Sequence, residues 1–306
     1  MTLGTDLAHS LELRQKPSWR RAKNTLMSVL LGSAVVVVAI PLVLIMYSVF
    51  AKGGAILFKS FPAFLTHDIP PTRAAGPGMG PAIVGTLLIT GMATLIAVPL
   101  GVLGAIYLNE YGVKSKFAQA VRFLALVMTG VPSVVMGLFV YVVWTLHHSI
   151  TPPHELTGFQ GFGGSLALAC LMLPIVINAT EQMLKLVPDG LREASYALGA
   201  TKTRTVLTVV LPAAGSGIVS GALLAVARAA GETAPLLFTI GATRVINTSL
   251  FHGDSTALSA RIFENAKEAV ANAQERGWGA ALALVLLTFT LTVIARVTTA
   301  FATRIK

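Results

Sequence analysis

Residues 26–50 read LMSVLLGSAVVVVAIPLVLIMYSVF, an apolar run without a charged side chain. A helix needs about 20 mostly apolar residues to cross the hydrocarbon core of a bilayer. A helix also satisfies its own backbone polar groups, which lipid cannot do. The run is roughly twice as long as the apolar region of a cleavable signal peptide, and it follows a polar, basic tail. We therefore expect it to remain in the membrane as the first span.

Five further runs of this kind follow, at about 82–108, 120–147, 161–186, 206–240 and 277–303. The run 206–240 is longer than one straight span requires. It contains Pro212, Gly231 and Pro235, so we expect a kink or a break within it. The sequence predicts an all-α polytopic membrane protein with six transmembrane helices, preceded by a basic tail over residues 1–25.

The composition of the whole chain agrees with a membrane protein. Of its 306 residues, 54% are hydrophobic and only 12% are charged, and the mean hydropathy is +0.75. Soluble domains carry about 25% charged residues. A chain with so many apolar residues has too little polar surface to face water on all sides. The bilayer must therefore act as the solvent for much of it. The net charge of +10 would otherwise suggest nucleic-acid binding, but the basic residues flank apolar runs, and we expect no nucleic acid as a partner.

The distribution of basic residues predicts the orientation in the membrane. With six spans, both termini lie on the same side. That side carries Arg14, Lys16, Arg20, Arg21, Lys23, Lys114, Lys116, Arg122, Lys185, Arg192, Lys202, Arg204, Arg296, Arg304 and Lys306. The opposite side carries fewer: Lys52, Lys59, Arg73, Arg244, Arg261, Lys267 and Arg276. Because cytoplasmic segments are enriched in lysine and arginine, we expect both termini in the cytoplasm.

The loop between the fourth and fifth runs, about 187–205, contains the sequence PDGLREASYALGA at 188–200. Asp189 can cap a short helix. Leu191, Ala194 and Leu198 would then form one apolar stripe, and Gly199 is a natural helix stop. Such a helix could dock on a partner, or the segment could be a plain linker between two spans. The pattern by itself leaves both readings open.

Two charged residues, Arg228 and Glu232, fall inside the fifth run. A charge within a membrane span is costly and rare unless it pairs or lines a wet path. Residues four apart share a helix face, so these two side chains can pair. They are either a structural ion pair or part of a substrate pathway. A guanidinium group suits a phosphate oxyanion best among side chains, which favours the pathway.

Motifs of catalysis and metal binding are missing from the sequence. It has no Gly-x-x-x-x-Gly-Lys-Ser/Thr loop for ATP, no Gly-x-Ser-x-Gly turn and no His-Glu-x-x-His helix. His147, His148 and His154 lie without a carboxylate or cysteine at ligand spacing, so we interpret them as part of a solvated loop. We expect no catalytic residue, no metal and no cofactor in this chain. An intramembrane enzyme is disfavoured for the same reason.

The loop at 187–205 also resembles a known motif. Glu193-Ala194-Ser195, three residues, Gly199, nine residues, Val209, one residue and Leu211-Pro212 match the spacing of the EAA motif of ATP-binding-cassette importer permeases. The family has alanine at the position of Ser195 and isoleucine at that of Val209. In that family, this segment is the coupling helix that sits in a cleft of the cytoplasmic ATPase. The resemblance implies coupling roles for Leu191, Glu193, Ala194, Ser195, Leu198 and Gly199.

Other segments are similar to the phosphate-specific group of these permeases. They are PAIVGT at 81–86, AIYLNEY at 105–111, TGVPSVVMGLF at 129–139 and RAAGETAPLL at 228–237. Together they cover the chain from about residue 80 to its end. Of the two homologous permeases in such a system, the chain is most similar to the A-type subunit, because of its short first external loop.

The resemblance implies a permease domain over residues 26–306 that imports inorganic phosphate by alternating access across a bacterial cell membrane. The implied partners are a second, homologous permease, a cytoplasmic ATPase dimer and an extracytoplasmic phosphate-binding protein. Arg228 and Glu232 would line the substrate pathway. Two alternatives stay open: a permease of the same class for sulfate, molybdate or another anion, and a secondary transporter or channel that needs no ATPase.

Overall fold

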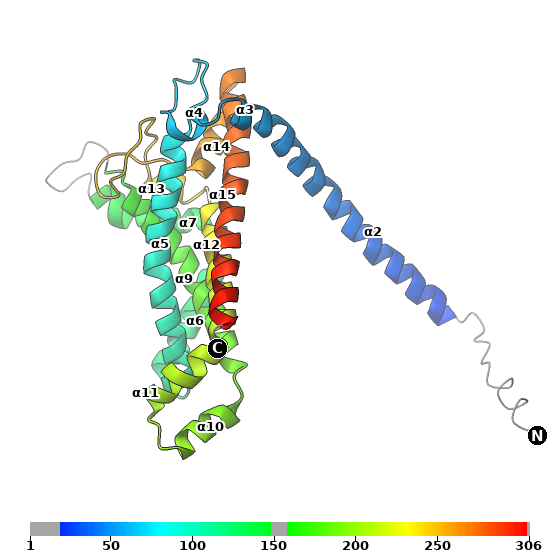
Figure 1. The fold of residues 1–306 in the computed structure, drawn as a ribbon, viewed down its shortest axis with the longest axis vertical. Coiled ribbons are helices and arrows are strands. Elements are labelled where there is room, and N and C mark those ends of the chain that lie inside the picture. Colours follow the sequence, from blue (N-terminus) through cyan, green and yellow to red (C-terminus); the bar gives the residue numbers. More distant parts are fainter. Residues whose placement is uncertain (1–18, 148–157, 305–306) are drawn as a thin grey trace, which may run out of the picture. The chain divides into compact units, whose positions relative to one another are not determined.

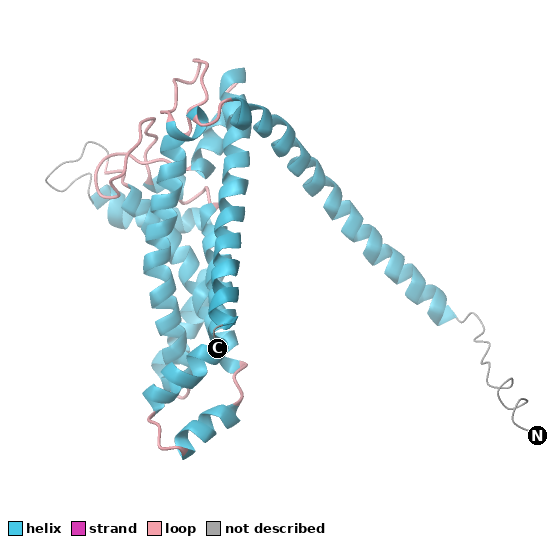
Figure 2. Cartoon of the chain, viewed as in Figure 1, coloured by secondary structure: helices cyan, strands magenta, loops and turns pink. Residues whose placement is uncertain are grey.

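The computed structural model describes residues 19–147 and 158–304. Helices joined by turns and loops make up these two ranges, and neither contains a strand (Figure 2). The all-α prediction is therefore confirmed. The chain divides into two compact units, residues 1–50 and 51–306. The first unit holds one long helix, α2 (Trp19–Ser48), which coincides with most of the first predicted span.

Three long helices build the centre of the second unit: α5 (Gly80–Ile106), α9 (Gly161–Lys185) and α12 (Leu211–Ala230). α9 packs along α5 on one side and α12 on another (Figure 1). Their buried apolar side chains form the largest part of the core, which includes Ile89, Ala93, Leu168, Met172, Val176 and Ala225. Glycines allow the close approach: a Cβ on Gly101 would lie 2.7 Å from Val176 Cγ1, and one on Gly221 would lie 2.6 Å from Ala179 Cβ.

Five helical stretches are long and apolar enough to cross a membrane: Ala22–Lys59, Gly80–Tyr111, Gly161–Lys185, Lys202–Ala230 and Ala271–Ile294. They correspond to predicted spans one, two, four, five and six. The last belongs to α15 (Ala271–Arg304). Some stretches continue through a π-helical turn, such as Tyr107–Tyr111 after α5 and Val206–Val210 before α12.

The third predicted span, about 120–147, is not one straight helix. It consists of two limbs. The first is α6 (Lys116–Gly130), and the second is α7 (Ser133–Val140) together with the π-helical turn Tyr141–Thr145. The chain bends by 109° between the two limbs. Val131 and Pro132 between them have extended backbones. Proline disfavours helical geometry in the residue before it and supplies no N–H, so the helix ends at Gly130.

Contacts with α9 indicate that the two limbs together follow the full length of the bundle. Arg122, in the middle of α6, donates from Nε to Glu181 Oε1 near the end of α9, at 2.9 Å. Trp144, at the end of the second limb, donates from Nε1 to Gln160 Oε1 at 3.2 Å, just before α9 begins. A re-entrant loop would return to the end where it started. This pair is a broken span.

The break predicted in the fifth run is confirmed. α12 ends at Ala230, the backbone turns through Gly231, and a short helix α13 (Leu236–Thr239) follows Pro235. The two broken spans meet here: a Cβ on Gly137 of α7 would lie 2.6 Å from Pro235 Cα. The breaks of the third and fifth spans therefore support each other by direct packing.

At the end of the bundle opposite the loop 187–205, short helices and loops form a cap (Figure 1). They include α3 (Gly54–Lys59), α4 (Ala63–Thr66) and α14 (Leu258–Lys267). Arg276 of α15 fastens the loop after α4, because its Nη1 donates to Ala74 O at 2.7 Å and its Nη2 to Thr72 O at 2.9 Å.

Candidate functional site

The predicted coupling segment forms a short helix, α10 (Asp189–Ala197). Its C-terminal end is closed by a Schellman arrangement: Gly199 N donates to Tyr196 O at 2.9 Å and Ala200 N to Ser195 O at 3.1 Å. Gly199 has φ +80°, in the left-handed region that glycine tolerates without steric cost. The prediction that Gly199 stops the helix is confirmed.

The predicted capping role of Asp189 is wrong. Pro188 occupies the N-cap position, and no side chain caps this end of α10. Asp189 is instead the first helical residue, and its Oδ1 accepts from Arg192 Nη1 at 3.0 Å. Because Pro188 occupies the N-cap position, Asp189 falls in the first turn of α10. Its carboxylate can therefore pair with Arg192, three residues later on the same helix.

The apolar stripe predicted on α10 faces away from the rest of the chain. Leu191 is 45% exposed and Leu198 is 89% exposed. Glu193, Ala194 and Gly199 are also exposed. Leu191, Ala194 and Leu198 thus form an exposed apolar stripe, and such a stripe has the character of a docking surface.

Ser195 lies on the other face of α10. It is buried, and its hydroxyl oxygen lies 2.9 Å from Thr205 Oγ1. Thr205 ends α11 (Lys202–Thr205), the turn that leads into the fifth span. Of the six predicted coupling residues, Ser195 is thus the one that the chain uses internally, to tie α10 to its own next helix.

Arg192 was not among the predicted site residues, yet it makes the most bonds on α10. Its Nη1 donates to Val187 O at 2.7 Å, and its Nη2 donates to Leu184 O and to Glu110 Oε1, each at 3.0 Å. Glu110 lies in the π-helical turn that ends the second span, and its side chain is 6% exposed. The two residues are 82 apart in sequence, so no local pattern could have paired them.

Arg228 and Glu232 come together as predicted, with Nε and Oε1 3.5 Å apart. They do not share one continuous helix face. Arg228 stands in the last turn of α12, whereas Glu232 follows the C-cap residue Gly231. The Arg228 side chain is 68% exposed and that of Glu232 is 20% exposed. The pair therefore marks the broken end of the fifth span, with the guanidinium on the surface of this chain.

The backbone of Glu232 is held from the α14 side. Ser259 Oγ donates to Glu232 O at 2.8 Å. On the same short helix, Arg261 is buried and donates from Nε to Thr256 Oγ1 at 3.0 Å and from Nη1 to Glu264 Oε2 at 2.7 Å. Burial lowers the pKa of the Arg261 guanidinium from its ordinary value, and the Glu264 carboxylate opposes that shift. α14 is thus an ordered support for the charged pair.

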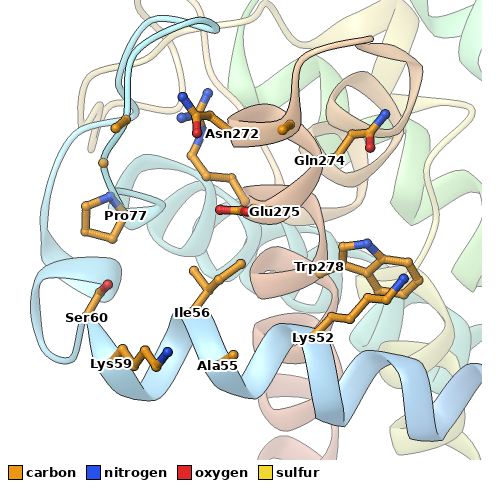
Figure 3. Close-up of a pocket in the computed structure, with 14 residues that line it drawn as sticks. Lys52, Ala55, Ile56, Lys59, Ser60, Pro77, Asn272, Gln274, Glu275 and Trp278 are labelled. Carbon is orange, nitrogen blue, oxygen red and sulfur yellow. The ribbon is translucent and has the colours of Figure 1, made fainter.

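A cavity at the cap has a volume of about 670 Å³ and opens between α3 and the first turns of α15 (Figure 3). Lys52 and Lys59 reach it from the α3 side, and Lys52 Nζ lies 4.7 Å from the centre of the Trp278 ring. Neither the charged pair nor α10 lines this cavity. Its size therefore says nothing about the substrate pathway.

Candidate metal ligands do not cluster in the part of the chain that the structure describes. His148 and His154, which we interpreted as loop residues, lie outside the described ranges. His147 is exposed at the end of the second limb of the third span.

Comparison with known proteins identifies the family. Residues 97–306 match the model of the binding-protein-dependent transport system inner membrane component. A protein of Yersinia pestis described as phosphate transport system permease protein PstA is 42% identical over 93% of this chain and 92% of its own length. The chain belongs to this family of permeases. Further relatives are PstA 1 of Mycobacterium tuberculosis H37Rv (40% identical; 93% of this chain, 90% of the relative) and PstA of Haemophilus influenzae (36%; 91% and 94%).

Solved structures agree on the fold of the permease. A bacterial ABC transporter involved in the import of the acidic polysaccharide alginate superposes with a TM-score of 0.60, at 16% identity, covering 92% of this chain and 98% of that one. The MetNI methionine ABC transporter gives a TM-score of 0.54 at 19% identity, covering 72% and 91%. The predicted importer-permease fold is confirmed. The chain is a multi-pass inner-membrane protein and a permease subunit, not a catalytic one.

Proposed function

We propose that this permease is one of two homologous membrane subunits of an ATP-driven importer that carries inorganic phosphate into the cytoplasm by alternating access. The phosphate substrate is supported by the names of relatives that are 36–42% identical over more than 90% of the chain. Each of these relatives is described as a phosphate transport permease, which favours phosphate over sulfate or molybdate.

The observation that carries the proposal is the uncovered apolar stripe of α10. Leu198 is 89% exposed although it lies in a loop between two spans. A leucine in water gains about 1.5–3 kcal/mol when a partner buries it completely. A cytoplasmic ATPase subunit that receives α10 in a cleft would supply that burial, with Glu193 beside the apolar contact. A channel or secondary transporter has no use for such a surface.

The exposed guanidinium of Arg228 supports an anion pathway between this permease and its homologous partner. An uncovered charge on a span is tolerated where it meets water, a counter-charge or a partner. Two such subunits facing each other would enclose Arg228, which can bind a phosphate oxyanion through two parallel N–H donors. Glu232, within 3.5 Å, would limit how tightly the anion binds and so allow its release.

The roles of the binding protein, the termini and the ATPase follow from this arrangement. An extracytoplasmic phosphate-binding protein would deliver substrate to the cap formed around α4 and α14, whose loops are held in place by Arg276 and Arg261. Both termini would face the cytoplasm, in line with the distribution of basic residues. ATPase closure would then push α10 and tilt the spans, which switches access to the pathway from one side to the other.

The test is transport by the complete system. The permease is co-expressed with its candidate partner permease and ATPase, purified as one complex, and reconstituted in vesicles with the binding protein. We expect ATP-dependent uptake of radiolabelled phosphate that excess unlabelled phosphate blocks and excess sulfate or molybdate does not. Uptake driven by an ion gradient without ATP would refute the importer mechanism, and equal competition by sulfate would refute the substrate.

A further inference from the structure

Arg192 is the link between the coupling helix and a different span. Of the ion pairs in the described ranges, those of Arg192 are the ones that involve α10, and its pair with Glu110 reaches another element. The Arg192 side chain is 14% exposed and that of Glu110 is 6% exposed. The carboxylate of Glu110 also accepts from Asn109 Nδ2 at 2.9 Å. A pair this well buried and bonded holds its two elements at a defined separation.

Glu110 sits at one end of the second span, which is helical from Gly80 to Tyr111. At its other end, Thr86 Oγ1 accepts from Leu258 N of α14 at 2.8 Å, and a Cβ on Gly85 would collide with Thr256 O. The second span is therefore anchored at both ends by specific contacts.

The far anchor leads directly to the charged pair. Ser259 follows Leu258 on α14, and its hydroxyl donates to Glu232 O at 2.8 Å. From Arg192 on the coupling helix to Glu232 at the break of the fifth span, the connection thus consists of one buried ion pair, one helix and two hydrogen bonds. Contiguous networks of packed helices, ion pairs and hydrogen bonds of this kind can carry coupling between distant sites.

We propose that Arg192 and Glu110 are positioning residues that clamp the coupling helix to the second span, so that movement of α10 displaces α5 and, through α14, the backbone at Glu232. The proposal rests on the proposed coupling function of α10. It adds a second route to the one that chain connectivity already supplies, from α10 through α11 into the fifth span.

A neighbouring ion pair provides a matched control. Arg122 Nε and Glu181 Oε1 lie 2.9 Å apart at the same end of the bundle, and Arg122 Nη2 also donates to Leu108 O. This pair joins α6 to α9 and does not touch α10. Each pair is a salt bridge to a buried carboxylate, but only loss of the Arg192–Glu110 pair unclamps the coupling helix.

The experiment compares Glu110→Gln, Arg192→Gln, the double variant and Arg122→Gln in the reconstituted complex. The quantity measured is phosphate imported per ATP hydrolysed, alongside co-purification of the ATPase. We expect Glu110→Gln to keep the ATPase and its hydrolysis but to import at least about fivefold less phosphate per ATP, the lower end of usual coupling effects. Arg122→Gln should remain within about twofold of the wild type.

The double variant decides whether the two residues act as one unit. Because each single change already opens the clamp, the double variant should be no worse than the worse single one, which is the signature of direct interaction. Glu110→Gln leaves the bonds of Arg192 to Leu184 and Val187 possible, so it is the variant to rely on if Arg192→Gln fails to assemble.

Three results would overturn the proposal: unchanged phosphate per ATP in Glu110→Gln, an equal loss in Arg122→Gln, or losses of the two single variants that multiply in the double one. Each of these outcomes requires an active wild-type complex. A wild-type complex without ATP-dependent phosphate uptake would instead refute the proposed function, so the two failures are distinguishable.

Discussion

Leu198 offers a way to separate docking from folding. Its side chain is 89% exposed at the end of α10. Leu198 is the C-cap residue of α10, but it caps through its backbone N–H, which alanine retains. Replacing it with alanine should therefore change the stability of the isolated permease by no more than about 0.5 kcal/mol, as for other exposed surface substitutions. Any larger effect on assembly must then come from a partner that covers this residue.

The expected size of that effect follows from the atoms removed. Leu198→Ala deletes three carbon atoms, and each buried methylene contributes about 0.8 kcal/mol. If the ATPase buries the side chain completely, about 2.4 kcal/mol of binding free energy is lost, which corresponds to roughly 50-fold weaker association. Partial burial in the cleft scales the effect down in proportion.

The assay is the affinity of fluorescently labelled ATPase for the purified permease pair, measured by titration, with thermal unfolding of the permease recorded in parallel. Leu186→Ala is the matched control, because Leu186 is 73% exposed near the same end of the bundle but lies outside α10. We expect weaker binding for Leu198→Ala and wild-type binding for Leu186→Ala. Equal affinity of both variants and the wild type would refute the docking role, as would a fall in the unfolding temperature of Leu198→Ala.

Two further predictions concern the pathway and the orientation. Arg228→Gln should abolish phosphate uptake even in combination with Glu232→Gln, because the anion then meets no cation. A purely structural ion pair would instead tolerate removal of both charges far better than removal of one. Near wild-type uptake by the double variant would therefore leave only a structural role for the pair. In a Cys170→Ser background, a cysteine at position 150 should react with an impermeant thiol reagent from outside intact cells, and one at position 200 should react only after permeabilisation; the opposite pattern would reverse the proposed topology.

Proline shows where prediction from the sequence reached its limit. Pro41, Pro99 and Pro174 each lie inside a continuous helix, and membrane helices that pack in a bundle tolerate such prolines. Pro132 instead ends α6, and the chain bends by 109°. The residue type is the same in all four cases. Beyond the bend at Pro132, Gly137 packs onto Pro235 of another span, and a contact between residues so far apart cannot be predicted from the local sequence.

The site was predicted unevenly for a similar reason. Spacing along α10 correctly grouped Leu191 and Leu198, because helical periodicity assigns residues to faces. It could not assign Ser195 to the buried face, since that depends on the position of Thr205 in the next helix. The pairing of Arg228 with Glu232 was visible from their separation of four residues. A break in this run was also expected, but its position between the two charges was not.

The sequence by itself determined that this protein lies in a lipid bilayer, and it determined the number and approximate limits of the apolar runs. It also determined that the coupling helix stops at Gly199 and to which family the motifs belong. These properties depend on local composition and spacing, which act over a few helical turns. Only the tertiary structure decided that the third span is broken, that Arg228 lies exposed at the end of α12, and that Arg192 reaches Glu110. These features depend on contacts between residues far apart in the chain, and such contacts exist only once the helices have packed.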